Sequence, residues 1–292
     1  MAFGFKYHVV TVCAIFFALT VGLVVGSLLV SPKVADKQQR AIVNLTDKLN
    51  EDLSKKEIEK EQNDRAMASI VPAAIKGRLQ FQKFAIIQTG DYVETTSILR
   101  ETLTQAGAQV VSITAIGPEM DRTDEVLLPA LATLQQSDNR FPTDRASLAS
   151  AIATVIGKAD VASAGIAAML EHENYIHRDP GIDFQAIPKY VVIVAGSKLE
   201  LSDRVINVDQ PLIASLQKLG VTVLMCENSD VHVSDVPNYR RLMPDVTTID
   251  NIDDPKGKCS LVFAVGGEVG NYGIKPSASY LLPPELTRFE AH

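Results

Sequence analysis

The chain has 292 residues, a net charge of −7 and 46% hydrophobic residues. An acidic balance of this kind argues against non-specific nucleic-acid binding, which depends on clustered Lys and Arg. The three cysteines are too few for a disulfide framework, so the fold must be stabilised by a hydrophobic core. The length is sufficient for one sizeable domain with additional segments.

The first feature along the chain is an uncharged apolar run from Val9 to Val30, between Lys6 and Lys33. As a helix, this run would span roughly 33 Å, about the thickness of the hydrocarbon core of a bilayer. A cleaved secretory signal is the alternative, but its apolar part is usually shorter and is followed by an A-x-A-like site. The pattern therefore predicts a transmembrane anchor over residues 1–31.

Small residues recur in this anchor at a spacing of four, at Ala14, Ala18, Gly22 and Gly26. This spacing places them on one helix face, where a second helix can approach closely. Gly and Ala are also common in membrane helices generally, and the two interpretations have similar weight. The orientation is ambiguous, because a count of Lys and Arg on either side puts the C-terminal part in the cytoplasm, yet the N-terminal tail is too short for that rule to decide.

Residues 32–76 are rich in Lys, Glu, Asp, Gln and Asn, which predicts a long polar helix. Ile42, Leu45, Leu49 and Leu53 form a narrow apolar seam, and this seam lapses into charged residues from Glu57. A charged helix with such a seam either pairs with another helix or stands as a solvated stalk. We therefore expect a coiled-coil stalk that ends near Pro72 and Gly77.

From residue 83 to residue 292 the pattern alternates between short apolar runs and helical periodicities. The runs predict strands at 84–88, 109–114, 190–195, 221–226 and 246–249, and the periodicities predict helices at 93–106, 124–136, 145–156, 161–172 and 211–219. Thr143 or Asp144 is the expected N-cap of the third helix. This alternation predicts an α/β fold with a doubly wound, mostly parallel Rossmann-like sheet.

Residues 259–265 could form a strand because they are largely apolar. However, Asp254 is a good N-cap, Pro255 suits the first helical position, and Gly266 and Gly267 follow the run. The capping signals predict a helix here.

Soft copper ligands are not clustered in the sequence, which has no C-x-x-C motif and no Met or His tract. His172 and His177 are five residues apart, on different sides of an expected helix, and His232 stands alone in an expected loop. Cys226 and Cys259 could pair only if their elements are neighbours, and Cys13 lies in the anchor. We therefore expect no cofactor and no metal site.

Ligands of open α/β sheets bind at the carboxyl ends of the strands. The candidate positions are Thr89, Gly90 and Asp91 after the first strand, Gly196 and Ser197 after the third, and Asp250 after the fifth. None of them belongs to a G-x-G-x-x-G, Walker or G-x-S-x-G motif. The sequence thus favours a non-enzymatic domain over a cryptic enzyme or ligand sensor, and we expect Asp250 and Asp254 to cap and close the last helix.

The chain resembles the MctB family of copper transporters, which is related to the SteB-like proteins of actinobacterial cell division. The resemblance rests on the end of the anchor at Val25-Gly-Ser27, on the junction 70–79 and most of all on the C-terminal tail. The tail residues that carry it include Asp250, Asp254, Gly257, Asn271, Tyr272, Gly273, Leu282 and Pro283. The resemblance implies an envelope protein with one N-terminal anchor, a coiled-coil stalk and an extracytoplasmic α/β domain.

The resemblance also implies a link to copper homeostasis and, for SteB-like members, to control of septal peptidoglycan hydrolysis. We expect a non-enzymatic scaffold or regulator in the cell membrane that forms a parallel homodimer through its anchor and stalk. The expected partners are the membrane, a SteA-like protein and a peptidoglycan hydrolase. Copper efflux is the alternative function, with copper as a ligand suggested by the family label alone.

Overall fold

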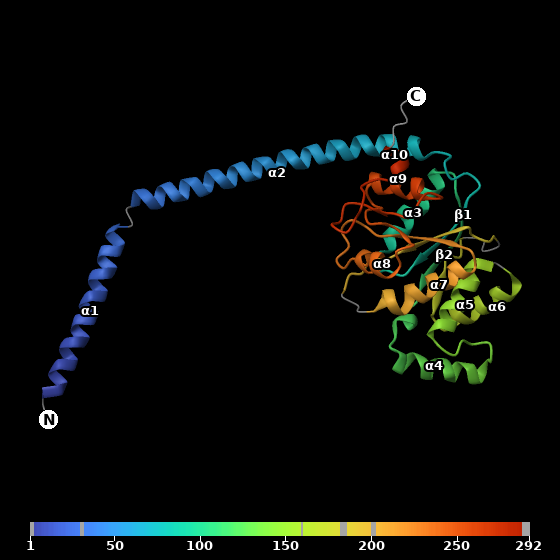
Figure 1. The fold of residues 1–292 in the computed structure, drawn as a ribbon, viewed down its shortest axis with the longest axis horizontal. Coiled ribbons are helices and arrows are strands. Elements are labelled where there is room, and N and C mark those ends of the chain that lie inside the picture. Colours follow the sequence, from blue (N-terminus) through green and yellow to red (C-terminus); the bar gives the residue numbers. More distant parts are fainter. Residues whose placement is uncertain (1–2, 30–31, 159, 182–185, 200–202, 288–292) are drawn as a thin grey trace. The chain divides into compact units, whose positions relative to one another are not determined.

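The computed structural model describes residues 3–29, 32–158, 160–181, 186–199 and 203–287 (Figure 1). Its contacts divide the chain into two compact units, Met1–Asn63 and Asp64–His292. The first unit is helical, and the second contains the whole sheet.

The first unit comprises helix α1, Phe3–Leu29, and most of helix α2, Pro32–Ile75. Tyr7–Gly26 of α1 is long and apolar enough to cross a membrane, and none of it is buried against the rest of the chain. Helix α2 continues through Pro72 to Ile75, within the end expected near Pro72 and Gly77, and Gly77 follows it with a φ of +75°. The left-handed glycine, rather than the proline, therefore ends the helix.

The second unit contains one seven-stranded sheet in the order β3-β2-β1-β4-β5-β6-β7. All neighbouring strands run parallel except β3, which is antiparallel to β2. The strands are β1 (Lys83–Gln88), β2 (Gln109–Ile116), β3 (Ile176–Arg178), β4 (Tyr190–Val194), β5 (Thr222–Cys226), β6 (Thr247–Ile249) and β7 (Asn271–Tyr272). The mixed α/β class predicted from the sequence is confirmed.

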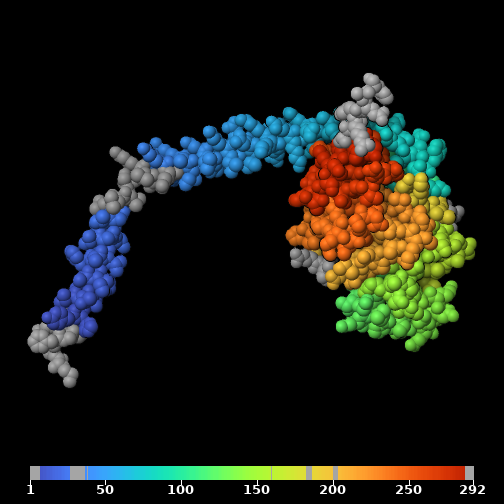
Figure 2. Space-filling view, in the orientation of Figure 1, coloured from blue at the N-terminus to red at the C-terminus, as the bar shows by residue number. Residues whose placement is uncertain are grey.

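Helices cover both faces of the sheet. Ala85 and Ile87 of β1 pack into one hydrophobic cluster with helices α4 to α8, while Phe84 and Ile86 pack into the other with α3, α9 and the end of α2. The helices are α3 (Val93–Gln105), α4 (Asp124–Ser137), α5 (Arg145–Lys158), α6 (Val161–His172), α7 (Gln210–Lys218), α8 (Val236–Leu242), α9 (Pro255–Ala264) and α10 (Pro284–Thr287). A 3₁₀ turn, η1 (Pro118–Asp121), and a π-helical turn, η2 (Val205–Asp209), complete the elements. Leu282 and Leu286 near the C-terminus pack in the same cluster as Val71 and Ile75 of α2, and Figure 2 shows the red C-terminal part of the second unit on its surface.

The five expected strands and the five expected helices are all present, and α9 confirms the helical interpretation of its region. Asp254 accepts a hydrogen bond from the backbone N–H of Lys256 (2.7 Å), as an N-cap does. Asp144 likewise accepts one from Ser147 (2.7 Å) at the start of α5. The shared helix expected for His172 and His177 is wrong, because α6 ends at His172 and His177 lies on β3.

Candidate functional site

Several of the buried polar side chains of the second unit follow the carboxyl ends of β1, β4, β5 and β6. The sequence predicted Thr89, Gly90 and Asp91 after β1, Gly196 and Ser197 after β4, and Asp250 after β6. The structure adds Glu227 and Asn228, which follow β5 directly. Because neighbouring parallel strands end at the same edge of a sheet, these residues form one polar rim, where an open α/β fold would bind a ligand.

The crevice between β1 and β4 is closed by backbone contact. The N–H groups of Thr89 and Gly90 both donate to the carbonyl of Val194, at 3.0 and 2.9 Å, and the N–H of Asp91 donates to the carbonyl of Gly196 at 3.0 Å. A Cβ added to Gly90 would lie 2.4 Å from that carbonyl oxygen. The glycine is therefore required for the close approach of the two loops.

Beside this contact, Arg204 bridges two loops. Its guanidinium pairs with Asp121 (2.6 Å) and Asp91 (3.3 Å) and also donates to the carbonyl of Thr89. Burial opposes the charge of Arg204, but the hydrogen bonds and charges of the two aspartates raise its pKa overall. Its positive charge is thus neutralised within the chain.

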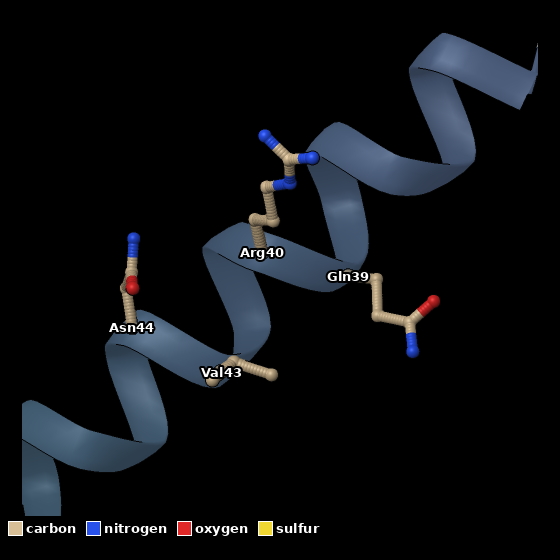
Figure 3. A pocket seen from close by; sticks show the side chains of 4 residues that line it. All are labelled: Gln39, Arg40, Val43 and Asn44. Carbon is tan, nitrogen blue, oxygen red and sulfur yellow. The ribbon is translucent and has the colours of Figure 1, made fainter.

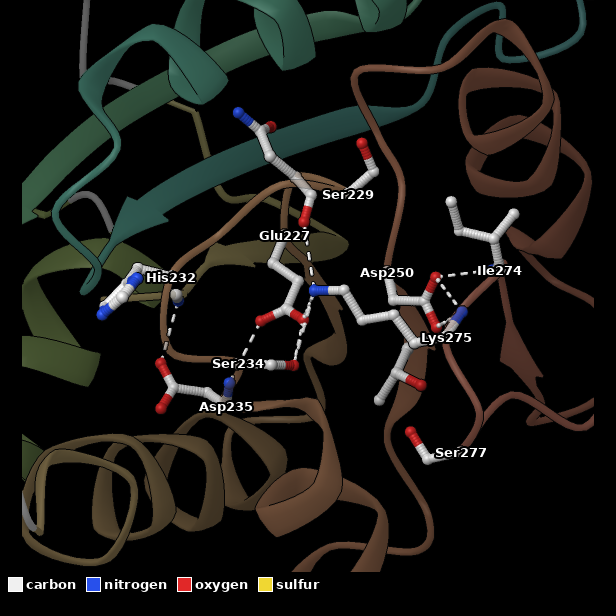
Figure 4. Close-up of polar contacts among 12 residues, drawn as sticks. Glu227, Ser229, His232, Ser234, Asp235, Asp250, Ile274, Lys275 and Ser277 are labelled. Carbon is white, nitrogen blue, oxygen red and sulfur yellow. Dashed lines mark hydrogen bonds and ion pairs between the residues drawn. The ribbon is translucent and has the colours of Figure 1, made fainter. Parts of the chain in front are cut away.

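Glu227 and Lys275 form the centre of the polar rim (Figure 4). Glu227 is fully buried and accepts hydrogen bonds from the ammonium of Lys275, from the hydroxyl of Ser234 and from the N–H of Asp235 (3.1 Å). Lys275 also donates to the carbonyl of Asn228 (3.1 Å). Burial raises the pKa of Glu227, and the neighbouring Lys275 opposes that rise.

The next carboxylate, Asp250, is also fully buried and organises the C-terminal tail. It accepts hydrogen bonds from the backbone N–H groups of Ile274 (2.7 Å) and Lys275 (3.3 Å) and from the guanidinium of Arg240 (3.2 Å). Its expected role in capping the last helix is therefore wrong, because Asp254 caps α9. Asp250 instead anchors the loop after β7 beside β6, as Figure 4 shows.

A third buried carboxylate, Asp209, lies in the π-helical turn before α7 and accepts a hydrogen bond from the hydroxyl of Tyr239 (2.7 Å). Burial raises the pKa of Asp209 to about 7, although Tyr239 stabilises its charged form. Thr89 is close enough to lower this pKa, yet the second carboxylate oxygen of Asp209 and the hydroxyl of Thr89 lack partners with hydrogen-bond geometry. A protonated Asp209 could donate to that hydroxyl, so the neutral form suits this position.

These carboxylates and cations are bonded mainly to one another. Arg204, Lys275 and Arg240 each neutralise a buried or half-buried carboxylate, and their bonds hold loops that follow different strands together. The polar rim thus acts chemically as a set of internal clamps.

The possible copper donors of the second unit lie apart. His172, His177 and His232 are exposed and belong to α6, β3 and a loop, while Cys226 and Cys259 are buried and unpaired. Burial raises the pKa of both thiols, which disfavours the thiolate that binds metal. Within the described ranges, no group of three or more His, Cys, Asp or Glu side chains is arranged to hold a metal ion.

One open hollow of about 330 Å³ lies between α3 and the β1–β2–β3 edge of the sheet. Arg100 and Arg178 contribute positive charge there, but Arg178 is held by Glu171 at 2.7 Å and Arg100 lies 3.7 Å from Asp179. A second hollow is lined by Gln39, Arg40, Val43 and Asn44, all from one stretch of α2 (Figure 3). It is the surface of a single helix, with no facing wall from another described element.

The predicted association residues of the first unit are all on exposed surface. Gly22 and Gly26 have open space where a Cβ would stand, and Ala14 and Ala18 precede them on α1. In α2, Ile42, Leu45, Leu49 and Leu53 are 56–71% exposed. The structure therefore keeps both sets on helices and leaves them uncovered.

The tail residues that carried the family resemblance have structural roles. Gly273 has a φ of +139°, and a Cβ there would lie 1.8 Å from an oxygen of Asp250, while a Cβ on Gly257 would lie 1.9 Å from the carbonyl of Asn251. Asn271 accepts a hydrogen bond from Thr248 (3.0 Å). Three further tail residues pack in or against the core, namely Tyr272, Leu282 and Pro283.

Sequence reasoning missed Glu227, Lys275, Arg240, Arg204 and Asp209. Glu227 could have been found, because it follows an apolar strand in the same way as the positions that were predicted. Lys275, Arg204 and Asp209 have no local signal, since their partners are distant in sequence; Lys275 and Glu227, for example, are 48 residues apart. Arg240 is only ten residues from Asp250, but it lies on a helix that was not predicted.

The fold and the rim together define a class: an α/β domain with internally paired strand ends, joined by a long polar helix to an apolar helix that fits a membrane. The sequence matches the family described as "Copper transport outer membrane protein, MctB" over residues 3–283. The chain belongs to this family, which makes it a cell-envelope protein of a copper-related group. No curated protein sequence matches it.

Proposed function

We propose that the chain is a non-enzymatic, membrane-anchored scaffold or regulator of the cell envelope that forms a parallel homodimer through α1 and α2. One observation carries the proposal. The seam of α2 (Ile42, Leu45, Leu49 and Leu53) is 56–71% exposed on a helix that has no covering element over these residues in the described part of the chain. Four large apolar side chains on one narrow face are typical of a helix that pairs with another.

The anchor supports the same association. Packing between small residues drives helix pairing in lipid, and the open space at Gly22 and Gly26 allows a close approach. Thr11 and Thr20, the polar side chains of its apolar core, donate to the carbonyls of Tyr7 and Phe16 four residues earlier. Those hydroxyls are therefore occupied, and the small-residue face is the best contact surface that α1 offers.

The seam and the anchor depend on each other energetically. Burying one leucine contributes roughly 1.5–3 kcal/mol at best, so a short seam alone gives a weak dimer. A paired anchor raises the effective concentration of the stalks to about the millimolar range. At this effective concentration, the weak seam is sufficient to pair the two stalks.

The second unit supports a non-enzymatic role because its strand-end groups bond to one another. Its parallel strands β2-β1-β4-β5-β6 and the helices on both faces also favour the doubly wound, Rossmann-like description of the sheet. We infer that this domain presents a surface to partners. By analogy with SteB-like relatives, these are a SteA-like protein and a peptidoglycan hydrolase.

The proposal places the α/β domain outside the cytoplasm, against the local count of Lys and Arg. Asp230 is exposed, whereas Ser229 is held by Asp253 at 2.6 Å, so Asp230→Cys is the better site for an impermeant thiol reagent. Labelling of whole cells is the expected result. Labelling that requires lysis would place the domain in the cytoplasm.

Disulfide trapping of the full chain in membranes tests the dimer most sharply. In a Cys13→Ser background, Leu45→Cys should cross-link to its copy, because a parallel pair places identical seam positions face to face. Ile58→Cys is the matched control: it is also exposed, but it lies about 180° around the helix from Leu49. Equal cross-linking at both positions would indicate random collision and would refute the paired seam.

The family description favours copper handling as a second candidate function. It requires ligands that come together, and the described His and Cys side chains of the second unit do not. Equilibrium dialysis of the full chain with Cu(I) distinguishes the two functions. We expect no stoichiometric binding, and binding that is lost in His232→Ala or Cys226→Ala would establish the copper function instead.

A further inference from the structure

The second unit is electrically polarised along its strands. Exposed cations lie in or directly beside the turns that precede β1, β4 and β5. They are Lys76, Arg78, Lys83 (the first residue of β1), Lys189 and Lys218 (the last residue of α7). Two exposed apolar side chains, Phe81 and Ile187, lie in the same turns. We call these seven residues the amino-end face.

Backbone hydrogen bonds place the members of this face side by side. The N–H of Lys189 donates to the carbonyl of Lys83 (3.0 Å), and the N–H of Thr222, at the start of β5, donates to the carbonyl of Lys189 (3.1 Å). On the other flank, Gln109 at the start of β2 donates to Gln82 (2.9 Å). The amino ends of four adjacent strands therefore form one continuous edge.

The charges on this edge are not compensated internally. Among the described residues, none of the four lysines pairs with a carboxylate, and the guanidinium of Arg78 lies over the ring of Phe263 at 4.0 Å and donates to the carbonyl of Ala74. Described carboxylates border the edge rather than lie on it. Asp245 and Glu268 precede β6 and β7, Asp160 follows α5, whose Gly157 contacts the turn before β5, and Glu285 lies beside Gly267. The opposite end of the sheet carries more carboxylates, although Arg204, Arg240 and Lys275 pair with four of them. These carboxylates are Asp91, Asp121, Glu227, Asp230, Asp235, Asp250 and Asp253.

Phe81 is the second unusual feature of the edge. It is 93% exposed and has a φ of +65°, in the left-handed region that bulky residues seldom adopt. Ile187 is 60% exposed in the turn before β4. Aromatic and aliphatic tips surrounded by lysines are the composition of a surface that lies in the interface of a bilayer.

We propose that the amino-end face docks onto an anionic bilayer, the one in which α1 is anchored. Lys and Arg meet the lipid phosphates, while Phe81 and Ile187 enter the headgroup region. The chain itself keeps the bilayer within reach, because α2 is about 66 Å long and α1 holds its start in the membrane. Docking turns the acidic strand-end rim away from the lipid, towards soluble partners. The inference rests on the anchor of the proposed function but not on the homodimer.

The test uses the full chain in lipid nanodiscs, in a Cys13→Ser background. A fluorophore is attached at Thr222→Cys on the amino-end face or at Asp230→Cys on the opposite end, and the discs contain lipids with a headgroup quencher. We expect quenching at position 222 in discs with phosphatidylglycerol, little in zwitterionic discs or at high salt, and little at position 230 in any disc. Retention of the chain in the disc at high salt depends on the anchor alone. A chain that is retained but not quenched therefore contradicts docking, whereas a chain that is lost from the disc contradicts the anchor of the proposed function.

Two double variants with the same charge change sharpen the result. Lys83→Gln with Lys189→Gln should weaken docking by about 25-fold, at about fivefold per lysine, while Lys198→Gln with Lys258→Gln, at the other end of the sheet, should leave it unchanged. Phe81→Ser should also weaken docking but keep its salt dependence. The proposal would be overturned by an equal loss of docking in both double variants, or by quenching that is independent of lipid charge. It would also be overturned if the chain bound soluble polyphosphate but showed no quenching by lipid.

Discussion

The two units of the chain differ in the burial of their apolar side chains and in the pairing of their charged side chains. In the second unit, apolar residues fill two clusters and buried charges pair with one another across loops. In the first unit, apolar residues of both helices are exposed, and an ion pair between Lys55 and Glu51 links one turn of α2 to the next. Such an exposed pair contributes only about 0.3–0.5 kcal/mol.

The difference shows where each unit obtains its stability. The α/β domain satisfies its groups internally, whereas α1 and the first part of α2 need lipid and another helix to cover their surfaces. A change in the second unit should therefore act on unfolding, and a change in the first unit should act on association. The predictions below test that separation, from the largest expected effect to the smallest.

Asp250→Asn should destabilise the second unit the most. It removes the carboxylate charge beside Arg240, whose side chain is only 7% exposed, and leaves a buried cation without its counter-ion. The expected loss is about 3–5 kcal/mol of unfolding free energy, measured by pulse proteolysis of the full chain in urea. Asp230→Asn, on the exposed loop, is the control and should stay within about 0.5 kcal/mol. Similar values for both would show that the buried pair does not stabilise the fold.

Asp209→Asn should change the pH dependence of stability. The native pKa of Asp209, about 7, exceeds its unfolded value near 3.8, so the native state holds this proton to higher pH. The contribution of Asp209 to stability should be full below about pH 4 and should fall until about pH 7, by up to about 4 kcal/mol. The asparagine variant lacks this decline, so it should match the unmodified chain near pH 4 and exceed it at pH 8.

The difference between the two unfolding curves isolates Asp209, because Glu227 and Asp235 titrate in both chains. Asp230→Asn again serves as the control, with a difference that does not vary over this pH range. A constant difference for Asp209→Asn as well would mean that Asp209 is charged in the native state at pH 5.

Leu45→Asp should leave the unfolding of the second unit unchanged and weaken association by about 1.5–3 kcal/mol per chain. Exchange of subunits between labelled full-length chains in detergent, followed by energy transfer, measures the dimer. Ile58→Asp makes the same chemical change away from the seam and should have little effect. Loss of the dimer in both variants would point to general repulsion between stalks.

Much of the second unit was predictable because its strands are short apolar runs and its helices carry their own caps. The run Tyr190–Val194, now β4, is buried throughout, and Asp254 with Pro255 identifies the start of α9 without any tertiary information. Strand β3 was missed because three residues after a helix have too little pattern to show a strand. Its hydrogen bonds to β2 define it, and these join residues about sixty positions apart.

The polar rim was only partly predictable for the same reason. Position relative to a strand end identifies Asp250, but its partner Arg240 lies on α8, a seven-residue helix that was not predicted. Burial of Asp209 likewise depends on the packing of α7 and α8, and a single aspartate in a sequence does not reveal it. Local sequence signals are sufficient to predict individual helices and strands. Pairs of side chains from different elements can be identified only once the fold is known.

The central claim, that association depends on the first unit and on its anchor, is tested most directly by sedimentation of three chains at low micromolar concentration. These are the full chain in detergent, the full chain with Gly22→Ile, and a chain that begins at residue 32. The account predicts a dimer for the first, and predominantly monomers for the other two, because the seam is weak without a paired anchor. A full chain that stays monomeric, or a dimer that persists without residues 1–31, would contradict it.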